Sequence, residues 1–124
     1  MNVVDSSGWL EYFGDGPNAD FFADAIAIMD NLLVPTVSVY EVYKRVLQQR
    51  GEDAAQAAVA IMIQGSVVDL DLTIALGAAD LSNQLKLAMA DSIILATARA
   101  HNATLWTQDA DFETVPGVKY VRKS

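Results

Sequence analysis

Four acidic side chains occupy positions from which they could form one site. Asp5 comes directly after a short apolar run that has the composition of a buried strand, and Asp109 follows a second such run after one intervening residue, Gln108. Glu41 and Asp91 lie near the beginnings of two helical patterns. In an open parallel α/β sheet, ligands bind at the edge where the strands end and the following helices begin. We therefore expect the four carboxylates to lie in one cleft at that edge.

The chemistry that best uses such a cleft is metal-dependent cleavage of phosphodiester bonds. Like charges that lie close together raise each other's pKa values unless a cation neutralises them. Oxygen ligands select hard ions such as Mg²⁺ or Mn²⁺, which activate water and stabilise the charge that develops on phosphorus. We expect Asp5, Asp91 and Asp109 to bind the ion and Glu41 to act as a ligand or a proton acceptor. Two neighbouring hydroxyl residues would hydrogen-bond to these ligands, Ser6 and Thr107.

Each of these acids also has a structural interpretation. Asp5 and Asp91 could cap helices, because Asp is a favoured N-cap residue. Glu41 could pair on an exposed helix face with Arg45, one turn later. Asp109 could be a turn residue after its strand. The combination of the acids, rather than any one of them, favours a metal site.

Other residues that often mark functional sites are expected to be structural. His101 is expected to end a helix, and Trp9 and Trp106 are expected to lie in the core. Lys44, Arg45 and Arg50 form a small basic cluster, which is typical of a solvated helix face. Because this basic cluster follows Glu41 in the sequence, it is also a candidate for phosphate contact.

Short apolar runs alternate with helical patterns along the chain. We expect strands at 2–4, 32–35, 67–70, 104–107 and 117–121. We expect helices at 8–13, 18–31, 36–50, 52–64, 73–83 and 91–100. Alternation at these short separations predicts an α/β fold, in which helices cover both faces of a parallel sheet through right-handed crossovers.

Local signals indicate where several helices begin and end. Asn18 is a candidate N-cap for the second helix, Asp91 would open the last helix, and Asp71 or Thr73 would cap the fifth. Gly51 suits the position after a helix, so the helices at 36–50 and 52–64 are expected to form a hairpin. In the second helix of this hairpin, small and apolar residues recur on one side: Ala54, Ala57, Ala58, Ile61 and Met62.

Composition limits the class of protein. With 124 residues, of which 52% are hydrophobic, we expect one domain over residues 1–124. The absence of cysteine excludes a disulfide scaffold and fits a reducing compartment. No apolar run approaches the roughly 20 residues of a membrane span, and no signal peptide is recognisable, so a cytoplasmic protein is expected. A net charge of −8 opposes broad binding of nucleic acid.

Three stretches together resemble the PIN-domain ribonucleases, and in particular the VapC-type toxins of bacterial and archaeal toxin–antitoxin pairs. They are VVDSSGWLEYF, VPTVSVYEVYKRV and LAMADSIILATARAHNATLWTQDADF, and their order and spacing make the match specific. The resemblance implies a PIN-like domain with a parallel sheet ordered 3-2-1-4-5 and metal-dependent RNA cleavage. The family's core acids fall on Asp5, Glu41, Asp91 and Asp109. Asp111 matches a more variable acid that would support the ligands, and Thr107 matches the hydroxyl residue before it.

The same resemblance implies two protein partners. One is a cognate antitoxin, encoded alongside the toxin, that restrains the ribonuclease. We expect a basic and apolar segment of the antitoxin to enter an acidic cleft rimmed by Trp9, Tyr12 and Phe13, where an Arg or Lys would pair with the carboxylates. The other partner is a second copy of the chain in a homodimer.

Other classes of protein use similar acids. A phospho-acceptor signalling domain needs an acidic pair at the first strand, and a haloacid-dehalogenase-like phosphatase needs D-x-D, but Ser6 and Ser7 follow Asp5. A calcium loop needs a longer series of ligands and a central glycine, which the sequence Asp109-x-Asp111 lacks. A catalytically idle PIN-like module that only binds protein is the alternative without enzymatic activity.

Overall fold

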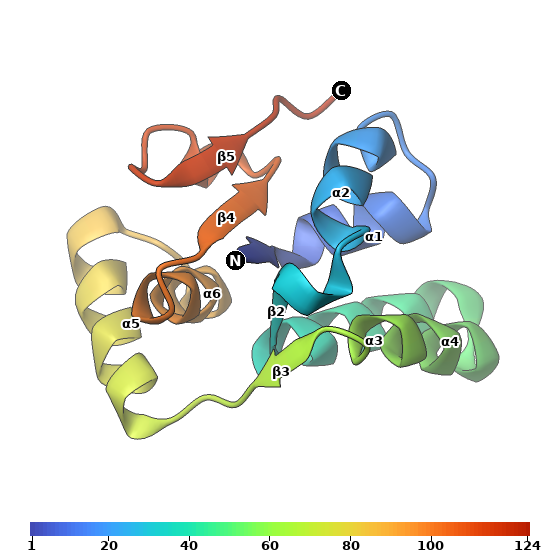
Figure 1. Ribbon diagram of the computed structural model, residues 1–124, viewed down its shortest axis with the longest axis horizontal. Coiled ribbons are helices and arrows are strands. Elements are labelled where there is room, and N and C mark those ends of the chain that lie inside the picture. The colour runs from blue at the N-terminus through green and yellow to red at the C-terminus, as the bar shows by residue number, and fades with distance from the viewer.

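A five-stranded parallel sheet runs through the centre of the molecule (Figure 1). The computed structural model describes all residues from 1 to 124. The strands lie in the order β3-β2-β1-β4-β5, and every neighbouring pair is parallel. Their bounds are β1 (Asn2–Val4), β2 (Leu32–Pro35), β3 (Ser66–Val68), β4 (Thr104–Thr107) and β5 (Val118–Tyr120). The predicted parallel sheet and its strand order are confirmed.

Six α-helices cover the two faces of this sheet. They are α1 (Ser6–Phe13), α2 (Ala19–Ile26), α3 (Thr36–Arg50), α4 (Glu52–Met62), α5 (Leu72–Leu85) and α6 (Met89–Ala100). Two short 3₁₀ helices, η1 (Met29–Asn31) and η2 (Ala110–Phe112), lie in connections. Helices α1 to α4 lie on one side of the sheet, and α5 and α6 lie on the other (Figure 1).

Each face of the sheet has its own hydrophobic core because side chains alternate along every strand. Val4 and Trp106 lie in the larger core, together with residues of α1 to α4. Val3 and Leu105, one residue earlier on the same strands, lie in the core beneath α6. Burial on both faces explains why the central strands read as continuous apolar runs rather than alternating ones.

Helix α6 lies between the sheet and α5, and all of its residues from Ser92 to Ala98 are buried. This burial confirms the helix that its apolar pattern predicted. The helix begins at Met89, however, and Ala88 is its N-cap, so Asp91 occupies the first turn and does not open the helix. The prediction missed this start because Met and Ala are strong helix formers that need no side-chain cap.

Predicted boundaries or caps were also wrong in α1 and α2. Helix α1 begins at Ser6 rather than Gly8, because the side chain of Asp5 caps it from the preceding position. Helix α2 ends at Ile26, and after a break of two residues the chain forms η1 (Met29–Asn31) instead of continuing the helix. Asn18 stands at the N-cap position of α2, but its side chain makes no capping hydrogen bond.

Helices α3 and α4 form the predicted hairpin, and Gly51 between them adopts a φ angle of 91°. The buried side of α4 differs from the prediction. Ala55, Ala58 and Met62 are buried, whereas Ala57 is exposed. An alanine-rich helix has little contrast between its sides, so its sequence does not specify which side faces the core.

At the open edge of the sheet, the chain runs from β3 into α5. Strand β3 ends at Val68, two residues earlier than the predicted end at Leu70. Asp71 caps α5, as predicted, because its carboxylate accepts a hydrogen bond of 2.8 Å from the backbone N–H of Ile74. None of the helices combines the length and the apolar character that crossing a bilayer requires.

Candidate metal centre

Asp5 lies at the end of β1 with only 2% of its surface exposed. Its carboxylate accepts hydrogen bonds from the backbone N–H of Gly8 at 2.8 Å, from Ser7 Oγ at 2.9 and 3.0 Å, and from Thr107 Oγ1 at 2.5 Å. These three groups supply three donor hydrogens, whereas a carboxylate offers about four acceptor positions. Asp5 is therefore almost fully engaged within the protein and keeps about one acceptor position free.

The hydroxyl group of Thr107 connects two acids at the edge of the sheet. Thr107 is the last residue of β4 and is fully buried. It donates its hydrogen to Asp5, and its oxygen accepts a bond of 2.9 Å from the backbone N–H of Asp109. The hydroxyl thus links the end of β1 to the loop after β4.

Asp91, Asp109 and Asp111 form a compact group of carboxylates. Ligand oxygens from all three lie within 4.8 Å of one another. Asp91 comes from the first turn of α6, and the other two come from the loop and the 3₁₀ helix after β4. The side chain of Asp109 also accepts a hydrogen bond of 2.9 Å from the N–H of Asp111. The sequence assigned Asp111 only a supporting role, but the fold brings its carboxylate into the group itself.

Glu41 lies in the second turn of α3 and is partly buried. Its carboxylate accepts a hydrogen bond of 2.6 Å from Ser6 Oγ, the first residue of α1. The alternative in which Glu41 only pairs with Arg45 on an exposed helix face would require a different partner. The bond from Ser6 holds Glu41 at the junction of α1 and α3, on the same edge as Asp5.

The charges of the other three predicted acids all act on the pKa of Asp91. Burial, followed by the charges of Asp109, Asp5, Glu41 and Asp111, raises the pKa of Asp91 to about 6. Burial is also the main reason that the pKa of Asp5 is raised to about 6, although its hydrogen bonds act in the opposite direction. Every charge that raises the pKa of Asp91 is a carboxylate, so the acids around it repel its ionised form.

The residues present fit a hard divalent cation. Mg²⁺ and Mn²⁺ prefer carboxylate oxygens, and Mg²⁺ is held at about 2.0 to 2.1 Å from each ligand oxygen. Oxygens of Asp91, Asp109 and Asp111 that already lie within 4.8 Å of one another need only small side-chain movements to surround such an ion. The surplus negative charge favours the same conclusion, because a divalent ion removes the repulsion that raises these pKa values.

The predicted aromatic rim of the cleft was wrong in one respect. Trp9 is fully buried in the larger core and stacks on Phe13, with 5.6 Å between the ring centroids. It therefore cannot contact a partner in the cleft. Tyr12 and Phe13 are partly buried against the same core. Only Phe13 of these aromatic residues lines a groove, which lies between α1, α3 and α4.

Two hollows that contain basic residues flank the acids. Lys44 and Arg45 line one hollow of about 300 Å³, together with Ser6 and Glu41. Arg122 and Lys123 line another of about 390 Å³, which includes Asp109. The first pair was a sequence candidate. The second was missed, because nothing in a short C-terminal tail indicates which part of the fold it contacts.

Comparison with known proteins identifies the fold family. The model of the PIN domain matches residues 3–118. No curated protein matches the chain significantly. Among solved structures, a toxin–antitoxin complex from Klebsiella pneumoniae is 23% identical, with a TM-score of 0.81, and the match covers 95% of each chain.

Two further structures have the same fold. VapC20 from Mycobacterium tuberculosis, described as a toxin that cleaves the sarcin–ricin loop, is 18% identical with a TM-score of 0.81, over 99% of this chain and 100% of that one. FitAcB from Neisseria gonorrhoeae is 20% identical with a TM-score of 0.77, over 98% and 97% of the two chains. Because the family model spans nearly the whole chain and these structures share its fold, the protein belongs to the PIN-domain family.

Proposed function

We propose that this protein is a Mg²⁺- or Mn²⁺-dependent endoribonuclease and the toxin of a toxin–antitoxin pair. The observation that carries the proposal is the group formed by Asp91, Asp109 and Asp111, whose ligand oxygens lie within 4.8 Å of one another in a PIN domain. Such a group favours a hard divalent cation. The structural similarity to VapC20, described as a toxin that cleaves the sarcin–ricin loop, supports RNA as the substrate.

The acids of the cleft would share the binding of the ion. Asp91, Asp109 and Asp111 would each offer a carboxylate oxygen. Asp5 would add its charge and its one free acceptor position, since the others are occupied by Gly8, Ser7 and Thr107. When bound, the ion supplies an activated water and stabilises the charge that develops on phosphorus.

Glu41 would accept the proton of the attacking water. It lies apart from the compact group, on α3, and the hydrogen bond from Ser6 fixes its orientation. Its charge nevertheless reaches the site, because it contributes to the raised pKa of Asp91. A carboxylate that is close to the ion but outside the compact group suits a proton acceptor better than a ligand.

Cleavage of a total-RNA mixture, read by mapping the new ends, tests the function. The wild-type protein should cleave with Mg²⁺ or Mn²⁺ and stop in excess chelator. Asp91→Asn should lower cleavage by about two orders of magnitude or more, because the ion loses a ligand. Asp24→Asn removes the same charge from an exposed position of α2 and should leave cleavage unchanged. Equal cleavage by Asp91→Asn, or full activity in chelator, would contradict the proposal.

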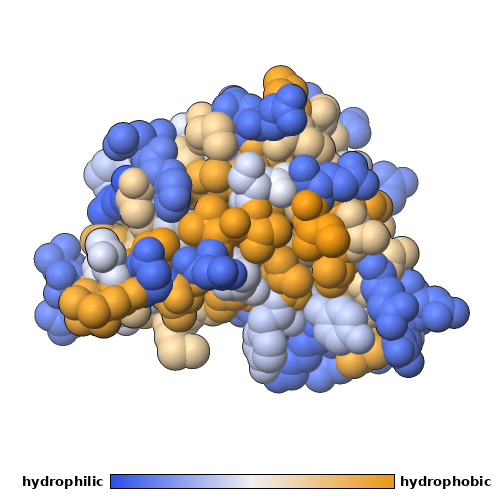
Figure 2. Space-filling model, turned by 60° about the horizontal axis from the view of Figure 1, so that its bottom comes forward, coloured by the Kyte–Doolittle hydropathy of each residue, from blue (hydrophilic) through white to orange (hydrophobic).

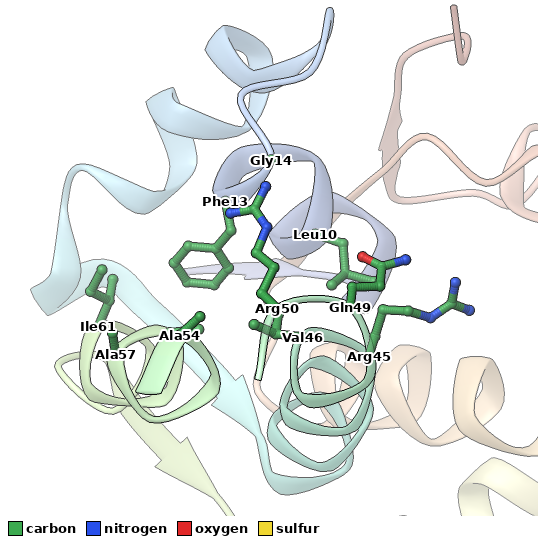
Figure 3. A pocket seen from close by; sticks show the side chains of 11 residues that line it. Leu10, Phe13, Gly14, Arg45, Val46, Gln49, Arg50, Ala54, Ala57 and Ile61 are labelled. Carbon is green, nitrogen blue, oxygen red and sulfur yellow. The ribbon is translucent and has the colours of Figure 1, made fainter. Parts of the chain in front are cut away.

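The groove between α1, α3 and α4 is the proposed contact for the antitoxin (Figure 3). It has a volume of about 370 Å³, and Leu10, Phe13 and Ile61 give it apolar walls. Leu10 and Arg45 also line the hollow that contains Glu41, so the groove leads toward the acids. A partner segment with apolar side chains in the groove could therefore place an Arg or Lys against the cleft carboxylates, in competition with the metal.

Purification from the native host at moderate salt tests this partner. A small protein should co-purify with the chain and inhibit RNA cleavage. Changing the Arg or Lys of its tail to Glu should restore cleavage. Isolation of the chain alone, as an active ribonuclease, would contradict the proposed antitoxin.

A second copy of the chain is the proposed partner for the exposed edge next to β3. Apolar side chains form a band across the face that Figure 2 turns toward the viewer. Around β3 and the start of α5, four large apolar side chains are exposed: Val67, Leu70, Leu72 and Leu76. Exposed apolar surface of this kind, beside an unpaired strand edge, marks sites of association.

A further inference from the structure

The residues after β5 lie beside the acid group and carry two cations that the proposed mechanism does not use. Arg122 and Lys123 line a hollow of about 390 Å³ whose other walls include Ser7, Asp109 and Tyr120. Ser7 donates its hydroxyl hydrogen to Asp5, and Asp109 belongs to the compact carboxylate group. The hollow therefore opens directly next to the site at which a phosphodiester would react.

The tail that carries these cations is attached to the fold at two points. The backbone N–H of Val121 donates to the carbonyl of Thr107 at 3.0 Å, which extends the pairing of β5 with β4 by one residue. The side-chain amide of Asn18 donates to the carbonyl of Arg122 at 3.0 Å and to Oε1 of Gln108 at 2.9 Å. Gln108 is itself buried. These contacts fix where the backbone of Arg122 lies relative to Asp109.

Positive side chains gather in the two hollows beside the acids. The chain has eight Lys and Arg residues in all. Four of these eight line the two hollows on either side of the acids: Lys44 and Arg45 on one side, Arg122 and Lys123 on the other. The adjacent residues Ser6 and Ser7, at the start of α1, belong to different hollows. A strand that crosses the acids would thus meet cations before and after the reacting bond.

We propose that the hollow of Arg122 and Lys123 binds a phosphate group of the RNA strand adjacent to the scissile phosphodiester. The proposal rests on the ribonuclease function proposed above. Lys and Arg bind phosphate through charge-assisted hydrogen bonds, and the partly exposed ring of Tyr120 offers a surface on which a base can stack. Asn18 acts as a positioning residue, because it holds the tail through the carbonyl of Arg122.

RNA explains this hollow better than a protein partner does. The hollow shares no lining residue with the apolar groove between α1, α3 and α4. Only Ala110 and Tyr120 among its lining residues are hydrophobic, so it offers little to an apolar anchor. It does adjoin Asp109, where the substrate must lie if the acids hold the catalytic ion. A phosphate in the hollow would be next to the reaction site.

Binding of a short fluorescein-labelled single-stranded RNA of mixed sequence, followed by anisotropy over a range of salt concentrations, tests the proposal. Asp91→Asn protein serves as the parent, so that binding is measured without cleavage. Adding Arg122→Gln and Lys123→Gln should weaken binding roughly tenfold and reduce the slope of log affinity against log salt by about 1. The same pair of changes in the otherwise wild-type chain should reduce cleavage of total RNA, while the calorimetric affinity for Mn²⁺ stays unchanged.

Lys86→Gln with Arg99→Gln is the matched control, because it removes two exposed positive charges elsewhere and should leave RNA affinity nearly unchanged. Asn18→Ala should lower RNA affinity but not Mn²⁺ affinity, since it releases the tail and keeps its charges. Asn83→Ala, at an exposed position of α5, controls for loss of an amide.

Equal losses in the tail variant and the Lys86/Arg99 control would overturn the phosphate subsite, and so would a parent protein that binds no RNA. A tail variant that keeps RNA affinity but loses affinity for a co-purifying protein would assign the hollow to that partner instead. Cleavage that disappears only with Asp91→Asn, and not with the tail variant, would leave the ribonuclease standing and refute the subsite. Absence of wild-type cleavage with either metal would refute the ribonuclease itself.

Discussion

The hydroxyl of Thr107 is the single group that connects Asp5 to the loop of Asp109. It donates to a buried carboxylate and accepts from a backbone N–H, so one oxygen atom satisfies two neighbours. Its bond to Asp5 also lowers the pKa of that acid against the effect of burial. Removal of the hydroxyl would leave a carboxylate and an N–H without their partner, whereas removal of the methyl group alone would not.

Thr107→Val should therefore reduce the free energy of unfolding by about 1 to 3 kcal/mol, the cost of leaving buried polar groups unpaired. It should also weaken Mn²⁺ binding, because Asp109 loses its anchor. Thr107→Ser keeps the hydroxyl and should cost only about 0.8 kcal/mol for the lost methyl group. Denaturant unfolding and calorimetry with Mn²⁺ measure both quantities. If Thr107→Val and Thr107→Ser changed the affinity for Mn²⁺ equally, the hydroxyl would not be what positions Asp109 for metal binding.

The raised pKa values of Asp5 and Asp91 predict an unusual pH dependence. Both are raised to about 6 in the folded chain, above the ordinary value of about 3.9 that applies after unfolding. The metal-free folded state therefore binds more protons, and its free energy of unfolding should fall as pH rises from about 4 through 6. Mg²⁺ or Mn²⁺ binds the ionised carboxylates and should raise Tm more at pH 7.5 than at pH 5.

Thermal melts in chelator and in millimolar Mn²⁺, at both pH values, check this dependence. The double variant Asp5→Asn with Asp91→Asn provides the control, since it should flatten the pH dependence between these values. A metal-free protein that becomes steadily more stable from pH 5 to 7.5 would show that these two acids are not the dominant titrating groups. A Tm that does not respond to the metal at either pH would count against a shared metal site.

At the scale of elements, the close approach of α1 to the sheet brings Gly8 to the carboxylate of Asp5. A Cβ on Gly8 would lie 2.5 Å from Cε1 of Phe22 and 2.7 Å from Cγ1 of Val4. Both neighbours are fully buried and cannot move aside easily. The absence of a side chain at this position therefore permits the contact between α1, α2 and β1. The same contact lets the N–H of Gly8 donate to Asp5.

Gly8→Ala should destabilise the fold by about 1 to 3 kcal/mol through overpacking, although alanine favours a helix. It should also displace the N–H that holds Asp5, and so weaken Mn²⁺ binding. Gly77→Ala, in α5, is the matched control because a Cβ there would meet nothing within 4 Å. That change should be neutral or stabilise the helix by up to about 1 kcal/mol. Denaturant unfolding of both variants measures these changes. Equal stability of the two variants would contradict a tight contact of Gly8 with Phe22 and Val4.

At the scale of the whole molecule, one edge of the structure leaves apolar surface exposed to solvent. Helix α6 is covered by α5, whereas the edge formed by β3 and the beginning of α5 leaves large apolar side chains exposed. Leu76 is 61% exposed on this edge, and Tyr40, which lies on α3 in the hollow that contains Glu41, is 62% exposed. These two residues offer a matched pair for testing whether a second copy of the chain covers the edge.

The wild-type chain should be a dimer by size-exclusion chromatography with light scattering. Leu76→Glu should give a monomer, because a charge buried in an apolar interface is costly. Tyr40→Glu introduces the same charge at a similarly exposed position on α3 and should leave the dimer intact. A monomeric wild type, or a Leu76→Glu protein that is still a dimer, would refute this interface.

Local sequence patterns alone were enough to predict the parallel α/β sheet and the places where its acids stand. A strand buried on both faces appears in the sequence as a continuous apolar run. A helix buried on one face appears as apolar residues spaced three or four apart, so each element can be recognised from its own sequence. Asp5 and Asp109 stand at strand ends and Asp91 in a first helical turn, and the resemblance to the PIN family supplied the strand order. These features depend on residues that are neighbours in the sequence, or on a rule that holds for every parallel sheet.

Only the tertiary structure decided which acids meet and what surrounds them. It brought Asp111 into the carboxylate group and left Ala57 exposed on α4. It also placed the C-terminal tail beside Asp109, through a hydrogen bond between Asn18 and Arg122, residues that are 104 positions apart. These features depend on how whole helices and strands pack together, which sets the direction of side chains, the rotation of helices and the contacts between distant residues. No local pattern in the sequence carries that information.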